Sequence, residues 1–279
     1  MSAPRPVGLI AGLGRTPFLV ADGIRRAGEP VVVLGLRGYA DPALRELADE
    51  FRWVGMARVN GWIRRFRKFG VNRAVLIGGV HKRRMYTPLR LFSMLPDLRT
   101  ARIWYHTLRQ DKRDNAVLLA VADELSSEGI ELISSVEYCQ EHIASEGLMT
   151  STPVPSDSEG DVEFGWEIAR ASADLDIGQA IAVKERDILA VEAVEGTDAM
   201  IRRAGRLCPV GGWTLIKVAR PDQDMRFDVP TVGPDTLKRL KDARCRCLVV
   251  EAGKTIIVDK PQTLALADQL GIAIVGKRP

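Results

Sequence analysis

The N-terminal half of the chain alternates short apolar runs with segments of helical periodicity, and this alternation most constrains the fold. The runs are "VGLIAGLG" from Val7, "PVVVLGL" from Pro30 and "RAVLIGGV" from Arg73. A strand that is apolar throughout is buried on both faces, as in a parallel sheet covered by crossover helices. The sequence therefore predicts an α/β protein whose N-terminal domain is a Rossmann-like parallel sheet.

The pattern changes in the second half of the chain. Residues 144–163 are rich in Ser, Pro, Gly and acids without a period, which predicts a linker. Beyond them, "AIAVKERDILAV" predicts a hairpin that turns at Lys184–Asp187, and "CRCLVVE" with "EAGKTIIVD" predicts a second hairpin. Helices are expected after Thr197, Pro234 and Pro261. We therefore expect an N-terminal domain at 1–143 and a mixed α/β domain at 164–279.

The bulk composition excludes several classes of protein. The chain has 279 residues and a formal net charge of +4, which suits an anionic ligand but does not indicate nucleic acid. It has no long apolar run for a membrane span, and its N-terminus lacks the form of a signal peptide. Its four cysteines form no CxxC pair and histidine is scarce, so a zinc site is not expected. Cys245 and Cys247 are expected to be a reduced, buried pair on one face of a strand.

Two glycine loops follow predicted strands of the N-terminal sheet. Gly12 and Gly14 match the first two glycines of a dinucleotide fingerprint, but Pro17 takes the third position and no acid follows the second strand. This disfavours NAD binding and leaves a more general anion site at a helix N-terminus. Gly78 and Gly79 end the third strand and are expected at the same sheet edge. The alternative is that all four glycines only make tight turns.

Basic residues accompany the N-terminal sheet. The segment "WIRRFRKF", 62–69, places aromatic and aliphatic side chains on one helix face and cations on the other. We favour a helix that covers the sheet, with a helix lying on an anionic membrane surface as the alternative. The segment "HKRR", 81–84, directly follows Gly79 and suits either a bound diphosphate or a solvated loop.

The second half carries a group of polar residues where an apolar strand gives way to a helix. Gly196 and Thr197 suit a phosphate, because Thr197 is expected to cap the helix and free N–H groups lie there. Glu195 and Asp198 beside the cap are candidate ligands of a divalent cation, with a simple capped helix as the alternative. From their spacing, candidate phosphate ligands in the next strand and turn are Lys217, Arg220 and Arg226.

One carboxylate stands apart in "MRFDVPTVG". Asp228 lies between Phe227 and Val229 and is followed by Pro230 and Thr231. Read locally, such an acid caps a turn. Acids mixed with bases on this strand and turn also suit a complex of a metal ion with phosphate.

Together these segments resemble the LpxI family of UDP-2,3-diacylglucosamine pyrophosphatases. The matching features run in order along nearly the whole chain: "GLIAGLGRTP" at the start, "DIGQAIAVKERDILAVEAVEGTDAMIRR" at 176–203, "DVPTVG" at 228–233 and "EAGKTIIVD" at 251–259. The middle two are the specific ones, whereas residues 80–113 match the family pattern least.

The resemblance implies a cytoplasmic step of lipid A synthesis. UDP-2,3-diacylglucosamine would be hydrolysed to 2,3-diacylglucosamine 1-phosphate (lipid X) and UMP, with the lipid held between two domains. The catalytic aspartate of the family's "DxPTxG" segment matches Asp228. The family uses a divalent cation, so we expect Mg²⁺ or Mn²⁺ held by Asp228 with Glu195 and Asp198. Thr231, in the same segment, is expected to contact substrate.

The resemblance also bears on location and partners. A diacyl substrate implies transient contact with the inner face of the inner membrane, although the sequence predicts no span. No nucleic-acid partner is expected, and the oligomeric state stays open, with a homodimer among the options. The alternative function is a nucleotide-sugar or nucleotide-lipid binding protein without turnover, which would have no need of Asp228 near the phosphates.

Overall fold

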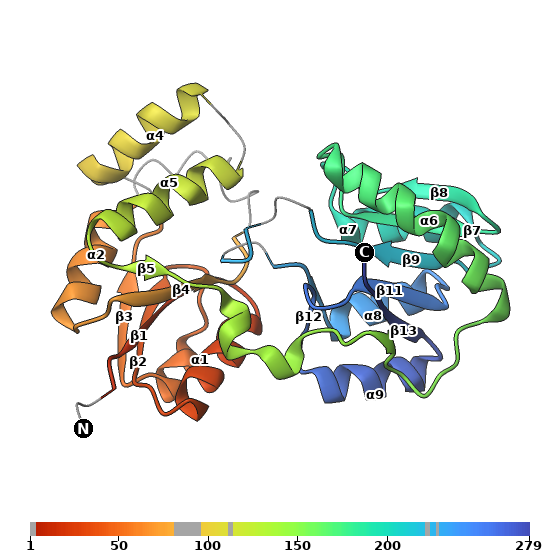
Figure 1. Ribbon diagram of the computed structural model, residues 1–279, viewed down its shortest axis with the longest axis horizontal. Helices are drawn as coiled ribbons and strands as arrows, with labels where there is room; N and C mark the ends of the chain where they lie inside the picture. Colours follow the sequence, from red (N-terminus) through yellow and green to blue (C-terminus); the bar gives the residue numbers. More distant parts are fainter. Residues whose placement is uncertain (1–3, 81–95, 111–113, 221–223, 227–228) are drawn as a thin grey trace. The chain divides into compact units, whose positions relative to one another are not determined.

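The computed structural model describes residues 4–80, 96–110, 114–220, 224–226 and 229–279 (Figure 1). The segment 81–84 and Asp228, both singled out by their sequence, lie outside these residues. The chain divides into two compact units. Unit 1 comprises Met1–Cys139 with Asp224–Asp228, and unit 2 comprises Gln140–Gln223 with Val229–Pro279.

Unit 1 is built on a sheet of order β3-β2-β1-β4-β5 (Figure 1). Its strands are β1 (Val7–Ala11), β2 (Val31–Leu36), β3 (Glu50–Val54), β4 (Arg73–Ile77) and β5 (Glu131–Leu132). The pairings described between them are parallel. The continuous apolar runs are fully buried in β1 and β2. The predicted parallel sheet is thus confirmed, and the physical reason is that both faces of these strands are covered.

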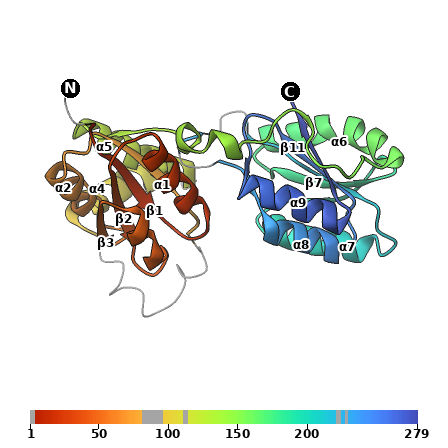
Figure 2. The same cartoon turned by 90° about the horizontal axis from the view of Figure 1, so that it is seen from below.

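Helices supply that cover. They are α1 (Thr16–Arg26), α2 (Val59–Lys68), α4 (Leu98–Gln110) and α5 (Asp114–Ser127), with short 3₁₀ turns at Pro42–Leu47 and Ser135–Tyr138. Side chains of α2, α4 and α5 join those of the strands in one core, whereas α1 packs on β1 and β2 (Figure 2). Trp62 and Phe66 of α2 are 4% and 0% exposed, so the interpretation of 62–69 as a covering helix is confirmed.

Unit 2 contains a mixed sheet of order β6-β13-β11-β9-β7-β8. Its strands are β6 (Gly147–Leu148), β7 (Ala180–Lys184), β8 (Asp187–Val191), β9 (Thr214–Lys217), β11 (Cys247–Glu251) and β13 (Ala273–Lys277). Strands β9, β11 and β13 are parallel, and β7 runs antiparallel to both β9 and β8. The predicted hairpin is confirmed: Lys184 pairs with Asp187, and Glu185 and Arg186 between them have φ of 54° and 61°, as a primed hairpin turn requires.

The second predicted hairpin is wrong. Strand β12 (Ile256–Ile257) does not pair with β11 but runs parallel to β10 (Thr231–Val232) in a separate small sheet. The N–H of Ile256 donates to the carbonyl of Pro230 at 2.8 Å, and the N–H of Val258 donates to that of Val232 at 2.9 Å. A distant segment thus satisfies the backbone groups that a hairpin would have paired.

The linker expected at 144–163 is also wrong, because these residues are part of unit 2. Strand β6 pairs with β13, and helix α6 (Ser156–Asp174) begins inside the segment. The acids Asp157 and Glu159 that made it resemble a linker lie in the first turn of α6, where negative charge complements the helix dipole.

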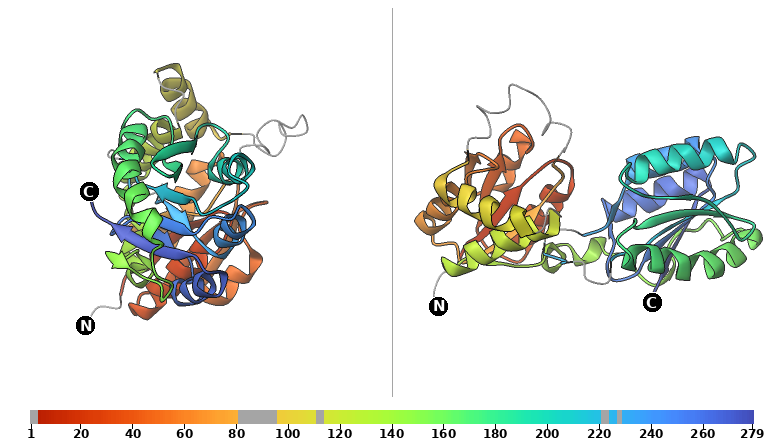
Figure 3. Two further views of the ribbon diagram at one scale, coloured as in Figure 1. Left: turned by 90° about the vertical axis from the view of Figure 1, so that its right-hand side faces the viewer. Right: turned by 90° about the horizontal axis from the view of Figure 1, so that it is seen from above.

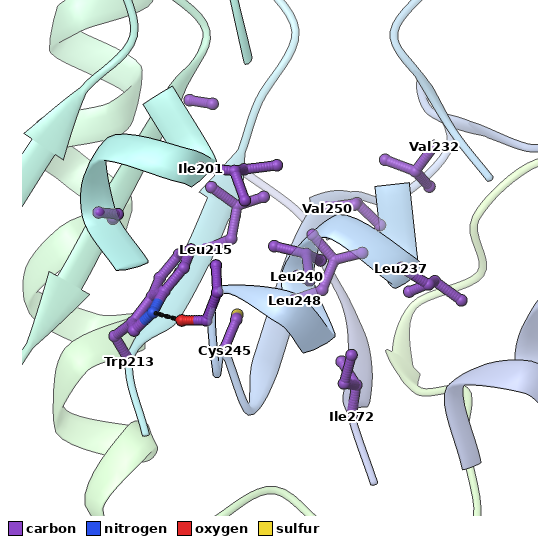
Figure 4. Packing of buried hydrophobic residues seen from close by; sticks show 14 of the residues in the cluster. Ile201, Trp213, Leu215, Val232, Leu237, Leu240, Cys245, Leu248, Val250 and Ile272 are labelled. Carbon is purple, nitrogen blue, oxygen red and sulfur yellow. Dashed lines mark hydrogen bonds between the residues drawn. The ribbon is translucent and has the colours of Figure 1, made fainter. Parts of the chain in front are cut away.

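Helices cover both faces of the unit 2 sheet (Figures 2 and 3). On one face α6 packs through Trp166 against β7, β9 and β11. The other face carries α7 (Thr197–Leu207), α8 (Pro234–Asp242) and α9 (Lys260–Leu270) over a cluster that includes Leu215, Leu240 and Leu248 (Figure 4). Within it the indole N–H of Trp213 donates to the carbonyl of Ala243 at 2.8 Å (Figure 4).

The cysteines are free and buried, as expected of a reduced chain. Cys245 and Cys247 lie in the cores on opposite faces of the sheet, so their expected placement on one strand face is wrong. The reason is that Cys245 precedes β11, where the alternation of a strand has not begun. Burial raises the pKa of the Cys247 thiol to about 12, which opposes reactivity.

Candidate functional site

The glycines predicted in unit 1 come together at the carboxyl ends of β1 and β4. The N–H of Gly12 donates to the carbonyl of Ile77 at 2.9 Å, and Leu13 and Gly79 exchange two backbone hydrogen bonds of 2.8 and 2.9 Å. A Cβ on Gly12 would lie 2.7 Å from the carbonyl oxygen of Gly78. Only glycine therefore lets the two loops approach this closely.

The position of this cluster in the sheet is significant. Strands β1 and β4 are neighbours, and the connection after β1 leads to β2 on one side whereas the chain after β4 leads to β5 on the other side. Ligands of open α/β sheets bind at such a switch point, outside the carboxyl ends of the strands. Helix α1 begins two residues after Gly14, whose φ of +99° also favours glycine. Thr16 is the first helical residue, and no side chain caps α1.

In unit 2 the carboxyl ends of β9 and β11 form a comparable edge, because these strands are parallel neighbours. Lys217 ends β9, and its ammonium donates to the carbonyl of Thr231 at 3.3 Å. The structure thus brings together two residues predicted to contact substrate. Arg220 lies just beyond β9 and forms an ion pair with Asp176 at 3.1 Å.

Sequence reasoning missed one acid at this edge. Glu251 ends β11, is 3% exposed, and accepts a 2.9 Å hydrogen bond from the N–H of Ala219. Its other oxygen faces the ammonium of Lys254 at 2.9 Å. The signal was available, since an acid directly after four apolar strand residues is the same kind of pattern that drew attention to Asp228.

The polar group at the start of α7 is arranged differently from the expectation. The N-cap is Gly196 with φ of +80°, and no side chain caps the helix. The hydroxyl of Thr197 instead donates to Glu192 at 2.8 Å, so the expected cap role of Thr197 is wrong. The reason is that Thr197 is already a helical residue, while Glu192, which directly follows β8, offers its hydroxyl a partner.

The two acids beside Gly196 each face an arginine. Glu195 forms an ion pair with Arg203, and Asp198 forms one with Arg239 at 3.3 Å. Within the ranges that the structure describes, no group of three or more His, Cys, Asp or Glu side chains could hold a metal ion. Asp228 lies outside these ranges, so the predicted metal site stays a prediction.

Arg226 is in a different unit from the other predicted phosphate ligands. It belongs to unit 1, whereas Lys217 and Arg220 belong to unit 2. Its guanidinium Nε donates to Asp224 at 2.9 Å, and its N–H donates to the same carboxylate at 3.0 Å. The Arg226 guanidinium holds the pKa of Asp224 below its ordinary value.

These features define an α/β protein of two units, each with polar loops at the carboxyl ends of parallel strands, where such folds bind phosphates and nucleotides. A model of the LpxI N-terminal domain matches residues 6–142, and a model of the LpxI C-terminal domain matches residues 145–275. The chain belongs to the LpxI family, as the resemblance implied. It is 32% identical over 285 residues to the UDP-2,3-diacylglucosamine pyrophosphatase LpxI of Caulobacter vibrioides, with 99% of this chain and 98% of that protein covered.

Proposed function

We propose that this protein hydrolyses the pyrophosphate bond of UDP-2,3-diacylglucosamine to lipid X and UMP, a cytoplasmic step of lipid A synthesis. The observation that carries the proposal is the match to a relative with this activity over 99% of the chain. The arrangement of the strand ends supports it, because a nucleotide diphosphate needs close backbone approach and cations to hold its oxygens.

The predicted residues take distinct roles in this proposal. The Rossmann-like edge of unit 1 would let the substrate approach the backbone closely at Gly12, Gly14, Gly78 and Gly79, although the N–H groups of Gly12 and Gly79 already donate to Ile77 and Leu13. Phosphate oxygens would be held by Lys217, Arg220 and Arg226, with further contacts from Gly196, Thr197 and Thr231. Asp228 would orient the attacking water. The ion pairs of Arg220 and Arg226 hold both guanidinium groups in place before substrate arrives.

A divalent cation, Mg²⁺ or Mn²⁺, is part of the proposal. When bound, it would neutralise charge that develops on the phosphates during hydrolysis. The predicted ligands are Asp228, Glu195 and Asp198. In the structure Glu195 is paired with Arg203 and Asp198 with Arg239. Each acid would therefore have to release its arginine partner to bind the cation.

The direct test is incubation of the purified protein with UDP-2,3-diacylglucosamine and Mg²⁺, followed by detection of UMP and lipid X. Hydrolysis in ¹⁸O-labelled water would show which phosphorus is attacked, through the product that carries the label. A protein that binds the UDP-lipid without releasing UMP would instead establish the alternative, a nucleotide-lipid binding protein.

A prediction about nucleotide binding follows from the glycine cluster. Gly12→Ala should weaken UDP binding by about tenfold or more, because its Cβ pushes the loops after β1 and β4 apart. It should also lower stability by about 1–3 kcal/mol. The matched control is Gly28→Ala, which has a left-handed φ of +75° and open space around it. The control should lose stability but keep UDP affinity; equal affinities for both variants would contradict the assigned role of Gly12.

A second prediction concerns the membrane. No helix in the described part of the chain has the length and apolar character to cross a bilayer, yet the proposed substrate carries two acyl chains. We propose salt-sensitive peripheral association with the inner membrane, in which the cationic face of α2 takes part. Charge reversal at Arg64 and Arg65 should weaken binding to anionic liposomes by about tenfold or more.

The control for this prediction is the same charge change on α7, Arg202→Glu with Arg206→Glu. In cosedimentation at low salt, the α2 double variant should bind liposomes less than the α7 double variant does. At high salt the two should bind to the same extent. Unchanged liposome binding of the α2 variant would leave that helix with its covering role alone.

A further inference from the structure

Helix α4 of unit 1 presents apolar side chains to solvent on one face. Leu98 and Tyr105 are 92% and 58% exposed, and Arg102 between them is exposed as well. Because they are spaced by four and then three residues, all three lie on one face of the helix. The opposite face is buried, since Thr100 and Ile103 are 2% and 8% exposed. We call the exposed face, Leu98 with Arg102 and Tyr105, the α4 stripe.

The beginning of α4 is tied to the beginning of α2, and α4 packs mainly on α2 and α5 (Figure 1). The N–H of Asp97 donates to the carbonyl of Ala57 at 3.1 Å. The carboxylate of Asp97 accepts the N–H groups of Asn60 and Thr100, both at 2.9 Å. Ala57 lies in the loop that follows β3, at the carboxyl edge of the unit 1 sheet. The α4 stripe therefore begins on the side of the sheet that carries the glycine cluster.

The charges around the α4 stripe favour an anionic partner. Residues 98–105 contain two arginines, Arg99 and Arg102, and no acid. Arg99 lies on the side of α4 that faces α5, where it pairs with Glu124 and Glu128 at 3.1 and 2.7 Å. Glu128 also pairs with Arg67 of α2 at 2.6 Å. Both acids are thus balanced by arginines, and the outer face of α4 keeps the positive charge of Arg102.

Exposed apolar side chains at the start of β7 and the end of β8 in unit 2 have a different setting. Leu175 and Ile177 flank Asp176, and Val194 directly precedes Glu195. An anionic surface attracts cations and repels such acids. The α4 stripe, which combines apolar side chains with a cation, fits an anionic surface better than these groups do.

We propose that the α4 stripe is the surface through which this protein enters the headgroup region of an anionic lipid bilayer. This inference rests on the proposed function, because a diacyl substrate has to be taken from a lipid surface, and it adds an apolar contact to the cationic face of α2. Tyrosine side chains favour the level of the lipid headgroups. Arginine can reach lipid phosphates while its stem stays on apolar surface. Buried apolar area together with attraction to anionic lipids holds a helix at such an interface.

The first test measures cosedimentation with vesicles of phosphatidylcholine and phosphatidylglycerol. Leu98→Ser with Tyr105→Ser keeps the charge and the buried face of α4, and it should weaken vesicle binding by about tenfold or more. Leu207→Ser with Val210→Ser is the matched control. These side chains are 60% and 82% exposed, where the chain passes from α7 to the amino end of β9. The control should bind as the wild type does, and equal binding of the two double variants would overturn the proposal.

A nitroxide label tests whether the α4 stripe enters the bilayer. All four native cysteines are buried, so Leu98→Cys and Leu207→Cys can each be labelled selectively. When vesicles are added, the label in Leu98→Cys should become more accessible to oxygen and less accessible to a water-soluble nickel complex. The label in Leu207→Cys should keep its accessibility to both. A label in Leu98→Cys that stays in water on vesicle-bound protein would overturn the proposal.

A second copy of the chain is the other partner that an apolar stripe could fit. Sedimentation velocity without lipid should give the same mass for the wild type and for the Leu98→Ser, Tyr105→Ser variant. A dimer that this variant loses, together with unchanged vesicle binding, would assign the α4 stripe to contact between copies and overturn the proposal.

The measured activities separate this proposal from the proposed function. With the UDP-lipid embedded in vesicles, the Leu98→Ser, Tyr105→Ser variant should release UMP about tenfold or more slowly than the wild type. With a short-chain UDP-diacylglucosamine dissolved in water, the two should have the same kcat. Equal rates on the vesicle-borne substrate would overturn the role of the α4 stripe. A wild type that releases no UMP from either substrate would overturn the proposed function, while vesicle binding and the nitroxide label would still decide the role of the stripe.

Discussion

Replacement of Asp228 by alanine should lower kcat for hydrolysis of UDP-2,3-diacylglucosamine by about 10²–10⁴-fold, the usual contribution of a positioned acid or base. Binding of the UDP-lipid should persist, because the carboxylate acts on the transition state more than on the ground state. It should even tighten if removal of the acid relieves repulsion of the diphosphate. Single-turnover kinetics with equilibrium binding to the same variant measure both effects.

Two further variants make this prediction decisive. Asp228→Asn should also be nearly inactive, whereas a residue that only caps a turn tolerates asparagine well. Asp235→Ala is the matched control, since Asp235 is an acid in the same stretch whose side chain is 81% exposed in the first turn of α8. It should keep near-normal kcat. A well-folded, fully active Asp228→Asn protein would contradict the catalytic assignment.

Removal of divalent cations is expected to abolish hydrolysis. Two phosphates and several carboxylates repel one another unless a cation lies between them. EDTA should therefore abolish UMP release, and added Mg²⁺ or Mn²⁺ should restore it. A titration of UMP release against the free metal concentration would measure this. The thermal stability of the substrate-free protein should change little, because the described residues show Glu195 and Asp198 already balanced by arginines.

Substitution of those acids tests the ligand assignment separately from the cation requirement. If Glu195 and Asp198 are ligands, Glu195→Gln and Asp198→Asn should each raise the Mg²⁺ concentration needed for half-maximal rate. Glu146→Gln is the control, since Glu146 is an exposed acid of unit 2 in an ion pair with Arg278 at 3.0 Å. Full activity in excess chelator would contradict the metal proposal, whereas unchanged Mg²⁺ dependence in both variants would leave Asp228 as the predicted ligand.

The sequence by itself determined the elements whose pattern is local. Runs that are apolar at every position required strands covered on both faces, so the parallel sheet of unit 1 followed from β1, β2 and β4. The β7–β8 hairpin could be predicted from the sequence because only a few residues separate its two strands. The helix at 62–69 was readable because its apolar positions recur with the helical period. Gly12, Gly14, Gly78 and Gly79 were singled out because glycines at a strand end often mark a left-handed turn or a close approach of two loops, and Gly14 and Gly78 have the turn and Gly12 the close approach.

The tertiary structure alone decided which distant segments pair. No local sequence pattern indicates that β12 pairs with β10 rather than with β11. The reason is that a strand can pair with any exposed strand edge when the chain collapses. The segment 144–163 has the composition of a linker, yet β13 and the core beneath α6 stabilise it as a strand and a helix. Thr197 has the residue type of a cap, but Glu192 competes for its hydroxyl.

The same distinction applies to the candidate site. Asp228 could be singled out in the sequence because its neighbours along the chain are apolar. Glu251 has apolar neighbours too, but its hydrogen-bond partner, the N–H of Ala219, is 32 residues away along the chain. Periodicity and residue type give information about a residue's own segment. The hydrogen-bond partners of a buried carboxylate, in contrast, can come from distant parts of the chain. Only the folded chain brings that carboxylate and that N–H together.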